Sequence, residues 1–277
     1  MKTPIFSYNS LIKNGIWEYD KYQSELAHSI ETLHQQIINF QNSNNKFISK
    51  YFRKRLNPPL GLYIYGSVGR GKSVMMDIFS NTNQIKQIKR VHFHAFMQDT
   101  HRRIREQRNI SKRGDPITYV AKSIFSETKV LCFDEFQVND AADAMILKRL
   151  FEKLFLMGLI IISTSNQHPD ELYHGGINRE LFLPFISLLK KKCRVFEING
   201  NRDFRLEKLV DNKVYFFPIN NESIFSFNSL FIKVSGSERS EKIIINVESR
   251  DIEIEKYSNG IGLMTFNSLC NQPLGSH

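Results

Sequence analysis

Short hydrophobic runs alternate with amphipathic segments through the middle of the chain, from Leu60 to about Asn199. The runs predict buried strands at Leu62–Tyr65, Val91–Phe96, Val130–Asp134, Leu159–Thr164 and Val195–Ile198. The segments between them predict helices from Lys72, around 98–107, around 118–126, at Ala141–Met157 and at Pro169–Lys192, the last with a break near Gly175-Gly176. Strands that alternate with helices indicate an α/β fold, in which a mostly parallel sheet is covered by helices on both faces.

Two segments of different character flank this core, which we place at residues 58–200. Residues 1–57 have apolar positions close to helical spacing and predict an N-terminal helical segment. That segment could fold over a nucleotide base through Asp20 and Gln23, although a helix start is the favoured interpretation of both. Residues 201–277 alternate instead and predict a small β-rich unit, with strands at Val214–Phe217, Ser229–Val234, Ile243–Val247 and Ile252–Lys256.

The segment between the first predicted strand and the first predicted helix is rich in glycine. It runs Gly66-Ser67-Val68-Gly69-Arg70-Gly71-Lys72-Ser73 and matches the phosphate-binding pattern G-x-x-x-x-G-K-[ST] in full. Its glycines let backbone N–H groups curl around phosphates, and the helix N-terminus adds partial positive charge. In such loops the lysine, here Lys72, contacts the β and γ phosphates, and the hydroxyl of Ser73 binds Mg²⁺. The loop therefore predicts a nucleoside-triphosphate site.

Two carboxylates, Asp134 and Glu135, follow directly after the hydrophobic run that begins at Val130. Because the carboxyl ends of parallel strands lie at the edge of the sheet where ligands bind, both are expected near the glycine loop. Asp134 is the candidate for the Mg²⁺ shell, and Glu135 is the candidate base that orients or deprotonates an attacking water. The alternative is a strand end that carries two solvated acids.

Two further polar residues are candidates for the same site. Asn166 follows the predicted strand at Leu159–Thr164 and could hold the water or the γ-phosphate, but a turn or cap residue before Pro169 fits its spacing equally well. Arg179 is a candidate arginine finger for a neighbouring subunit, although spacing alone favours a surface arginine. The absence of an N-K-x-D motif after the loop lowers the case for a GTPase.

Composition limits the other classes. The longest apolar runs are far too short to span a bilayer, the N-terminus has no signal pattern, and three cysteines have no metal-like spacing, so we expect a cytoplasmic protein. The formal net charge of +10 could indicate nucleic-acid binding. The basic residues are scattered, however, so we expect nucleic acid not to be the primary partner.

Several motifs together carry a resemblance to a known family. They are Gly61–Gly66, Val91–Met97, Leu131–Val138, Ala142–Leu147, Thr164–Asn166 and Asn178–Ile186. The chain resembles, over nearly its whole length, the ZapE family of AAA+-type ATPases linked to bacterial cell division, which has mitochondrial relatives. The resemblance implies an ATP-binding core with Gly66–Ser73 as Walker A, Asp134-Glu135 as Walker B, Asn166 as sensor and Arg179 as finger. It implies the division-ring protein FtsZ as partner. An Arg179 that acts on a neighbouring subunit would imply a homo-oligomer with shared sites, although a helix arginine alone does not prove one.

The chain departs from the family pattern at two places. Gln167 stands where family members usually carry arginine, and the chain stops at His277, where the family continues for about one hundred residues of helical lid. The main hypothesis is a Mg²⁺-dependent ATPase that acts on a protein partner. The alternative is an interaction module that binds nucleotide but hydrolyses little, because a missing lid would leave the site poorly closed. A weaker third hypothesis is a DNA-linked ATPase of the helicase-loader kind.

Overall fold

A computed structural model describes residues 3–15, 17–45, 57–82, 84–110, 114–199, 215–235, 240–247, 250–258 and 261–271. Contacts within the chain divide it into two compact units, Met1–Phe204 and Arg205–His277. None of the helices in these described ranges is long and apolar enough to cross a membrane. Each unit is described by itself below.

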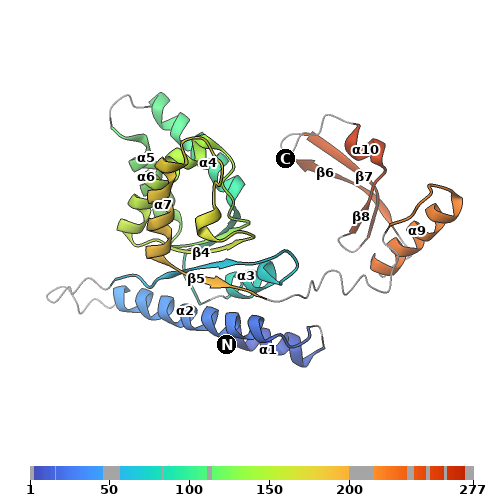
Figure 1. Cartoon of the computed structure of the whole chain (residues 1–277), viewed down its shortest axis with the longest axis horizontal. Coiled ribbons are helices and arrows are strands. Elements are labelled where there is room, and N and C mark those ends of the chain that lie inside the picture. Colours follow the sequence, from blue (N-terminus) through green and yellow to red (C-terminus); the bar gives the residue numbers. More distant parts are fainter. Residues whose placement is uncertain are drawn as a thin grey trace. The chain divides into compact units, whose positions relative to one another are not determined.

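A parallel sheet forms the centre of the first unit (Figure 1). Its strands are β1 (Gly61–Tyr65), β2 (Ile88–His92), β3 (Val130–Asp134), β4 (Ile160–Ser165) and β5 (Cys193–Glu197), in the order β2-β3-β4-β1-β5. Every neighbouring pair is parallel. β3 and β4 are buried along their whole length, which explains the apolar runs Val130–Phe133 and Ile160–Ile162 that begin them. The predicted α/β fold with a parallel sheet is confirmed.

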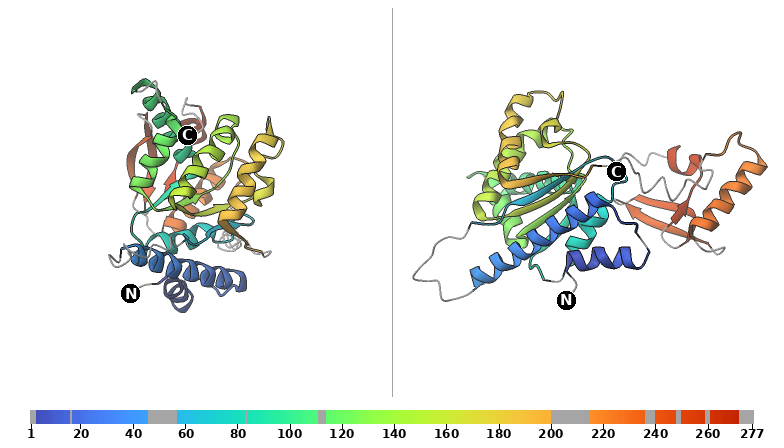
Figure 2. Two further views of the ribbon diagram at one scale, coloured as in Figure 1. Left: turned by 90° about the vertical axis from the view of Figure 1, so that its left-hand side faces the viewer. Right: turned by 60° about the horizontal axis from the view of Figure 1, so that its bottom comes forward.

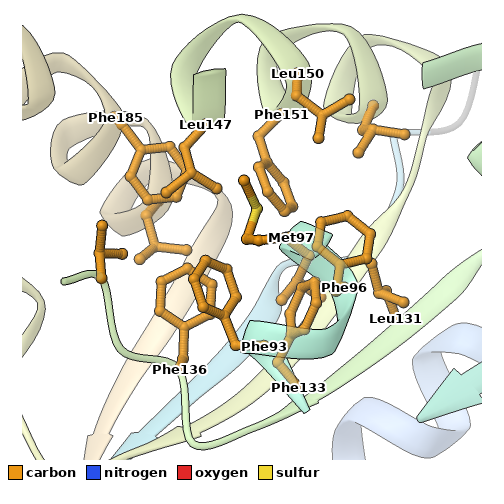
Figure 3. Close-up of a cluster of buried hydrophobic side chains, with 14 of the residues drawn as sticks. Phe93, Phe96, Met97, Leu131, Phe133, Phe136, Leu147, Leu150, Phe151 and Phe185 are labelled. Atoms are coloured by element: carbon orange, nitrogen blue, oxygen red, sulfur yellow. The ribbon is translucent and has the colours of Figure 1, made fainter. Parts of the chain in front are cut away.

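Helices cover both faces of the sheet (Figures 1 and 2). One face packs against α4 (Phe93–Ile110), α5 (Pro116–Glu127), α6 (Ala141–Met157) and α7 (Arg179–Lys192), and the other against α1 (Pro4–Lys13), α2 (Lys21–Asn45) and α3 (Lys72–Ser80). A short 3-10 helix, η2 (Pro169–Glu171), precedes α7. The first face is rich in phenylalanine: Phe133 of β3 and Phe136 meet Phe93 and Phe96 of α4 and Phe151 of α6 (Figure 3). The two cores fix the strand ends that carry the candidate site.

The predicted strand at Val91–Phe96 is wrong beyond its first two residues. β2 ends at His92, and α4 begins at Phe93. The alternation of histidine and apolar residues imitates a strand over a short window. The buried residues of α4, which are Phe93, Phe96, Met97, Thr100 and Ile104, recur at helical spacing over a longer one.

The second unit contains an antiparallel sheet of β6 (Glu241–Val247), β7 (Arg250–Ser258) and β8 (Ile261–Leu263), with helices α9 (Asn221–Ser235) and α10 (Phe266–Cys270). The predicted strand at Ser229–Val234 is wrong because this segment lies in α9. Reciprocal hydrogen bonds start that helix: the Asn220 side chain accepts from Ser223 N at 2.8 Å, and Ser223 Oγ accepts from Asn220 N at 2.9 Å. Residues 215–217 form no strand either, and Val214 lies outside the described residues.

Candidate nucleotide site

The glycine loop connects β1 to α3 at the carboxyl edge of the sheet. Gly71 has φ +82° immediately before α3, and Gly66 has φ +153° just after β1. A Cβ on Gly66 would lie 2.6 Å from the carbonyl oxygen of Ile198, and a Cβ on Gly71 would lie 3.0 Å from Gln23 Nε2. Glycine is therefore required at Gly66 by backbone conformation and by space, and at Gly71 by backbone conformation. The loop leads the N-terminus of α3 toward the edge where phosphates bind in such folds.

The ammonium group of Lys72 lies in the mouth of this loop. Its Nζ donates to the carbonyl oxygens of Gly66 at 2.6 Å and Ser67 at 2.7 Å, and to Asn166 Oδ1 at 3.0 Å. These acceptors are neutral oxygens. The structure thus brings Asn166, at the end of β4, next to the loop lysine, although 94 positions separate them in the sequence.

The two acidic residues at the end of β3 lie in different environments. Asp134 is buried, whereas Glu135 is exposed and has φ +52°, a conformation that residues other than glycine adopt uncommonly. Thr164 of β4 supports this turn: its Oγ1 accepts from Glu135 N at 3.3 Å, and its carbonyl oxygen accepts from Phe136 N at 2.7 Å. The side chain of Glu135 therefore projects at a strand end whose backbone is held by the neighbouring strand.

Sequence reasoning missed Arg90 of β2, which engages Asp134. Arg90 donates from Nε to Asp134 Oδ2 at 2.6 Å and from Nη2 to Asp134 Oδ1 at 3.2 Å. The same guanidinium forms an ion pair with Asp77 of α3 and donates to the carbonyl oxygen of Ser73 at 3.4 Å. Burial lowers the pKa of Arg90, but hydrogen bonds and charge from Asp134 and Asp77 outweigh it and hold that pKa above its usual range.

The oxygen donors around α3 and β3 suit magnesium. Ser73 is exposed at the start of α3, and a carboxylate such as Asp134 offers about four lone-pair sites, of which Arg90 uses two. No group of three or more His, Cys, Asp or Glu residues in the described part of the chain could hold a metal by itself. Mg²⁺ typically takes one or two carboxylates and completes its shell with water and phosphate oxygens, so this sparse donor set fits it.

The N-terminal segment contacts the glycine loop through Asp20 and Gln23. Asp20 Oδ1 accepts from Gln23 N at 2.9 Å, and Gln23 Nε2 donates to the carbonyl oxygen of Arg70 at 3.2 Å. Arg70 in turn donates to Asp20 Oδ2 at 3.4 Å and to the carbonyl oxygen of Asn199 at 2.8 Å. Gln23 is buried against the loop. The favoured interpretation of Asp20, a helix start, agrees with its cap bond to α2.

Arg179, the candidate finger, makes its described contact away from the loop. Arg179 is the first residue of α7, and its Nη2 donates to the carbonyl oxygen of Asp170 in η2 of the same chain. Gln167, where the family pattern has arginine, accepts from the Tyr63 hydroxyl through its carbonyl oxygen at 3.0 Å. Its side chain is exposed beside Asn166, and its backbone closes the turn after β4.

The glycine loop between β1 and α3, on a parallel sheet covered on both faces, defines an α/β fold of the P-loop class. A profile of the AFG1-like ATPase family matches residues 2–277, so the chain belongs to the AFG1-like ATPase family. This confirms the resemblance found in the sequence.

Two curated relatives illustrate the family. Lactation elevated protein 1 homolog B of Danio rerio is 39% identical over 245 residues, which cover 84% of this chain and 49% of the relative. Cell division protein ZapE of Escherichia coli K12 is 31% identical over 285 residues, which cover 99% of this chain and 75% of that protein. The chain thus spans about half the length of the Danio rerio relative. Among solved structures, AMPPCP-bound DnaA from Aquifex aeolicus matches with a TM-score of 0.47 and 17% identity, over 80% of this chain and 65% of that one.

Proposed function

We propose that this chain binds ATP with Mg²⁺ at the Gly66–Ser73 loop and hydrolyses it. The observation that carries the proposal is the position of the Lys72 ammonium, which lies in the loop mouth and is held by neutral oxygens of Gly66, Ser67 and Asn166. Such acceptors can be exchanged for phosphate oxygens, which bind an ammonium more strongly because they are charged. The family of the chain supports ATP as the nucleotide.

Each candidate residue then has one task. The loop N–H groups and Lys72 bind the β and γ phosphates, and Ser73 and Asp134 would hold Mg²⁺, which supplies charge neutralisation between those phosphates when bound. Glu135 accepts a proton from water as the water oxygen attacks the γ-phosphorus, and the bond to the ADP oxygen breaks. Asn166 orients the water or a γ-phosphate oxygen. Thr164 supports the backbone of Glu135 in the required position.

We further propose that turnover acts on a protein partner, in the cytoplasm. The Escherichia coli relative is named as a cell division protein, which supports a partner in cell division. The division-ring protein FtsZ is the candidate that the sequence resemblance suggests. Arg179 would complete the site of a neighbouring copy in a homo-oligomer, after release from the Asp170 carbonyl that it contacts here.

The direct test is steady-state ATP hydrolysis by the 277-residue chain, with Mg²⁺ and with EDTA, compared with Lys72→Ala. We expect turnover that needs Mg²⁺ and is lost in the variant. Turnover per chain that rises with protein concentration, and loses that rise in Arg179→Ala, would support the shared site. Nucleotide binding without any turnover would contradict the ATPase and leave the interaction module.

A further inference from the structure

Arg90, which the sequence analysis did not assign to the candidate site, makes several contacts there. It joins three groups on two elements: both carboxylate oxygens of Asp134 on β3, and Asp77 and the Ser73 carbonyl oxygen on α3. Arg90 and Asp134 lie 44 positions apart, and Arg90 and Asp77 lie 13 apart. The guanidinium therefore connects β3, which ends in the proposed Mg²⁺ ligand Asp134, to the first turn of α3, which contains the proposed Mg²⁺ ligand Ser73.

The burial of Asp134 explains why a fixed cation is needed here. The Asp134 side chain is 9% exposed, and a buried carboxylate without a partner is costly. A guanidinium that meets both oxygens of a carboxylate satisfies it and fixes its orientation at once. The Asp134 carboxylate is thus paired and oriented by the protein itself.

The contact between Arg90 and Asp134 also affects the binding of Mg²⁺ to the same carboxylate. Each oxygen of Asp134 keeps a lone pair for Mg²⁺, so the ion can bind without expelling Arg90. The two like charges would then share one carboxylate. A neighbouring like charge weakens the binding of a charge, as it does in the ionisation of paired groups. Arg90 should orient the site and lower its affinity for Mg²⁺ together.

We propose that Arg90 is the positioning residue that sets the magnesium requirement of this site, and that Asp77 moderates it by sharing the guanidinium charge. This inference rests on the proposed nucleotide function and deepens it. Asp77 accepts from Nη1 of the guanidinium, whereas Asp134 accepts from Nε and Nη2, and the Asp77 side chain is half exposed. Removal of Asp77 would leave Asp134 as the only carboxylate among the described partners of Arg90.

The test measures binding rather than turnover. A fluorescent, non-hydrolysable ATP analogue is held at fixed concentration, and Mg²⁺ is titrated into wild type, Arg90→Gln, Asp77→Asn and the double variant. Arg90→Gln should lower the half-saturating Mg²⁺ concentration about tenfold or more, the effect of one neighbouring charge at this range. Asp77→Asn should raise it, and that rise should shrink in the Arg90→Gln background, because Asp77 acts through Arg90.

Two controls separate the causes. Arg90→Lys keeps the charge but loses the two-pronged contact, so its half-saturating Mg²⁺ concentration should stay closer to that of wild type than that of Arg90→Gln does. Arg105→Gln removes a positive charge from an exposed position on α4 and should change nothing. In EDTA, Arg90→Gln should melt at a lower temperature than wild type, because Asp134 loses its partner. Mg²⁺ with the analogue should raise its melting temperature more.

The outcomes distinguish a failure of the inference about Arg90 from a failure of the proposed nucleotide function on which it rests. If wild type binds the analogue but Arg90→Gln needs as much Mg²⁺ or more, the inference is wrong and the proposed function stands. An Asp77→Asn effect of equal size in both backgrounds would also overturn it, since Asp77 would then act by its own charge. If Arg90→Gln does not fold, Asp77→Asn alone decides, and an unchanged Mg²⁺ requirement contradicts the inference. Absence of any analogue binding by wild type would refute the proposed function instead.

Discussion

Each of the two ends of the candidate site contains a cation, and the partners of the two cations differ. At the phosphate end, formed by the glycine loop and Asn166, Lys72 donates to two backbone carbonyls and one amide oxygen. At the other end, which we call the metal end because Ser73 and Asp134 are the proposed Mg²⁺ ligands, the Arg90 guanidinium is hydrogen-bonded to two carboxylates. Neutral acceptors release a cation to a charged ligand more readily than carboxylates do.

The difference in acceptors suggests different roles for Lys72 and Arg90. Under the proposed function, Lys72 transfers its hydrogen bonds to a polyphosphate, whereas Arg90 remains with Asp134 and orients the carboxylate that would receive Mg²⁺. A positive side chain near phosphates is thus insufficient to identify a phosphate ligand. The hydrogen-bond acceptors that such a side chain already has must be compared as well.

The largest expected effect is on turnover, and it comes from a variant that should leave the binding of ATP at the phosphate end intact. Glu135→Gln should lower ATP turnover about 10²- to 10⁴-fold, the usual contribution of a general base. Affinity for ATP should stay near that of wild type, because the proposed function gives the exposed Glu135 no contact with phosphate. Turnover and equilibrium binding are measured on the same preparation, with Glu152→Gln on α6 as a matched control. Equal loss of both quantities would contradict the base assignment.

The next effect concerns the phosphate end alone. Lys72→Ala should weaken ATP binding about 10- to 100-fold, because the loop loses a charged hydrogen-bond donor to the phosphates. Lys122→Ala removes an exposed lysine from α5 and serves as the control. Calorimetric titration gives both affinities. Unchanged affinity in Lys72→Ala would remove this lysine from the site.

A third variant makes the phosphate end resemble the metal end. Asn166→Asp places a carboxylate beside Lys72 and should weaken ATP binding about tenfold, because the new charge holds the ammonium and repels the phosphates. Asn166→Ala deletes only a neutral side chain, so its loss should be smaller. The comparison between the two ends fails if the aspartate variant binds ATP as tightly as the alanine variant does.

The smallest effect concerns the support of Glu135. Thr164→Val keeps the shape of the side chain but removes the Oγ1 acceptor of Glu135 N, and should lower turnover two- to tenfold, roughly the worth of one neutral hydrogen bond. Thr164→Ser keeps the hydroxyl and should restore turnover. Since the hydroxyl acts on Glu135 rather than on phosphate, the affinity for ATP should not move in either variant. A loss of affinity equal to the loss of turnover would assign Thr164 a general structural role.

The sequence allowed the sheet and the loop to be predicted because both are local patterns. Apolar runs bounded by glycine or aspartate located β1, β3 and β4 to within about one residue at each end. The phosphate loop needs eight consecutive residues, and its flanking strand and helix follow directly. The errors at 91–96 and 229–234 arose because short alternation imitates a strand in both segments. The signals that favour a helix lie outside those short windows. They are the buried positions at helical spacing along α4 and the Asn220 cap before α9.

The contacts across the site could not be predicted in this way. The partners of Arg90 lie on β3 and α3, and nothing in the sequence around Arg90 distinguishes it from a surface arginine. Its position in β2, which lies beside β3 in the sheet, gives the only local signal. A parallel register that pairs His92 with Asp134 would have suggested that the side chain two positions earlier could reach that carboxylate.

Hydrogen–deuterium exchange with mass spectrometry tests the central claim most directly, because it locates the ligand on the chain. The exchange of the wild-type protein is compared alone, with a non-hydrolysable ATP analogue, and with the analogue and Mg²⁺. We predict protection of peptides that contain residues 66–73 with the analogue alone, and added protection around 134–136 and 164–167 when Mg²⁺ is present. Protection confined to other segments, or none at residues 66–73, would contradict the account.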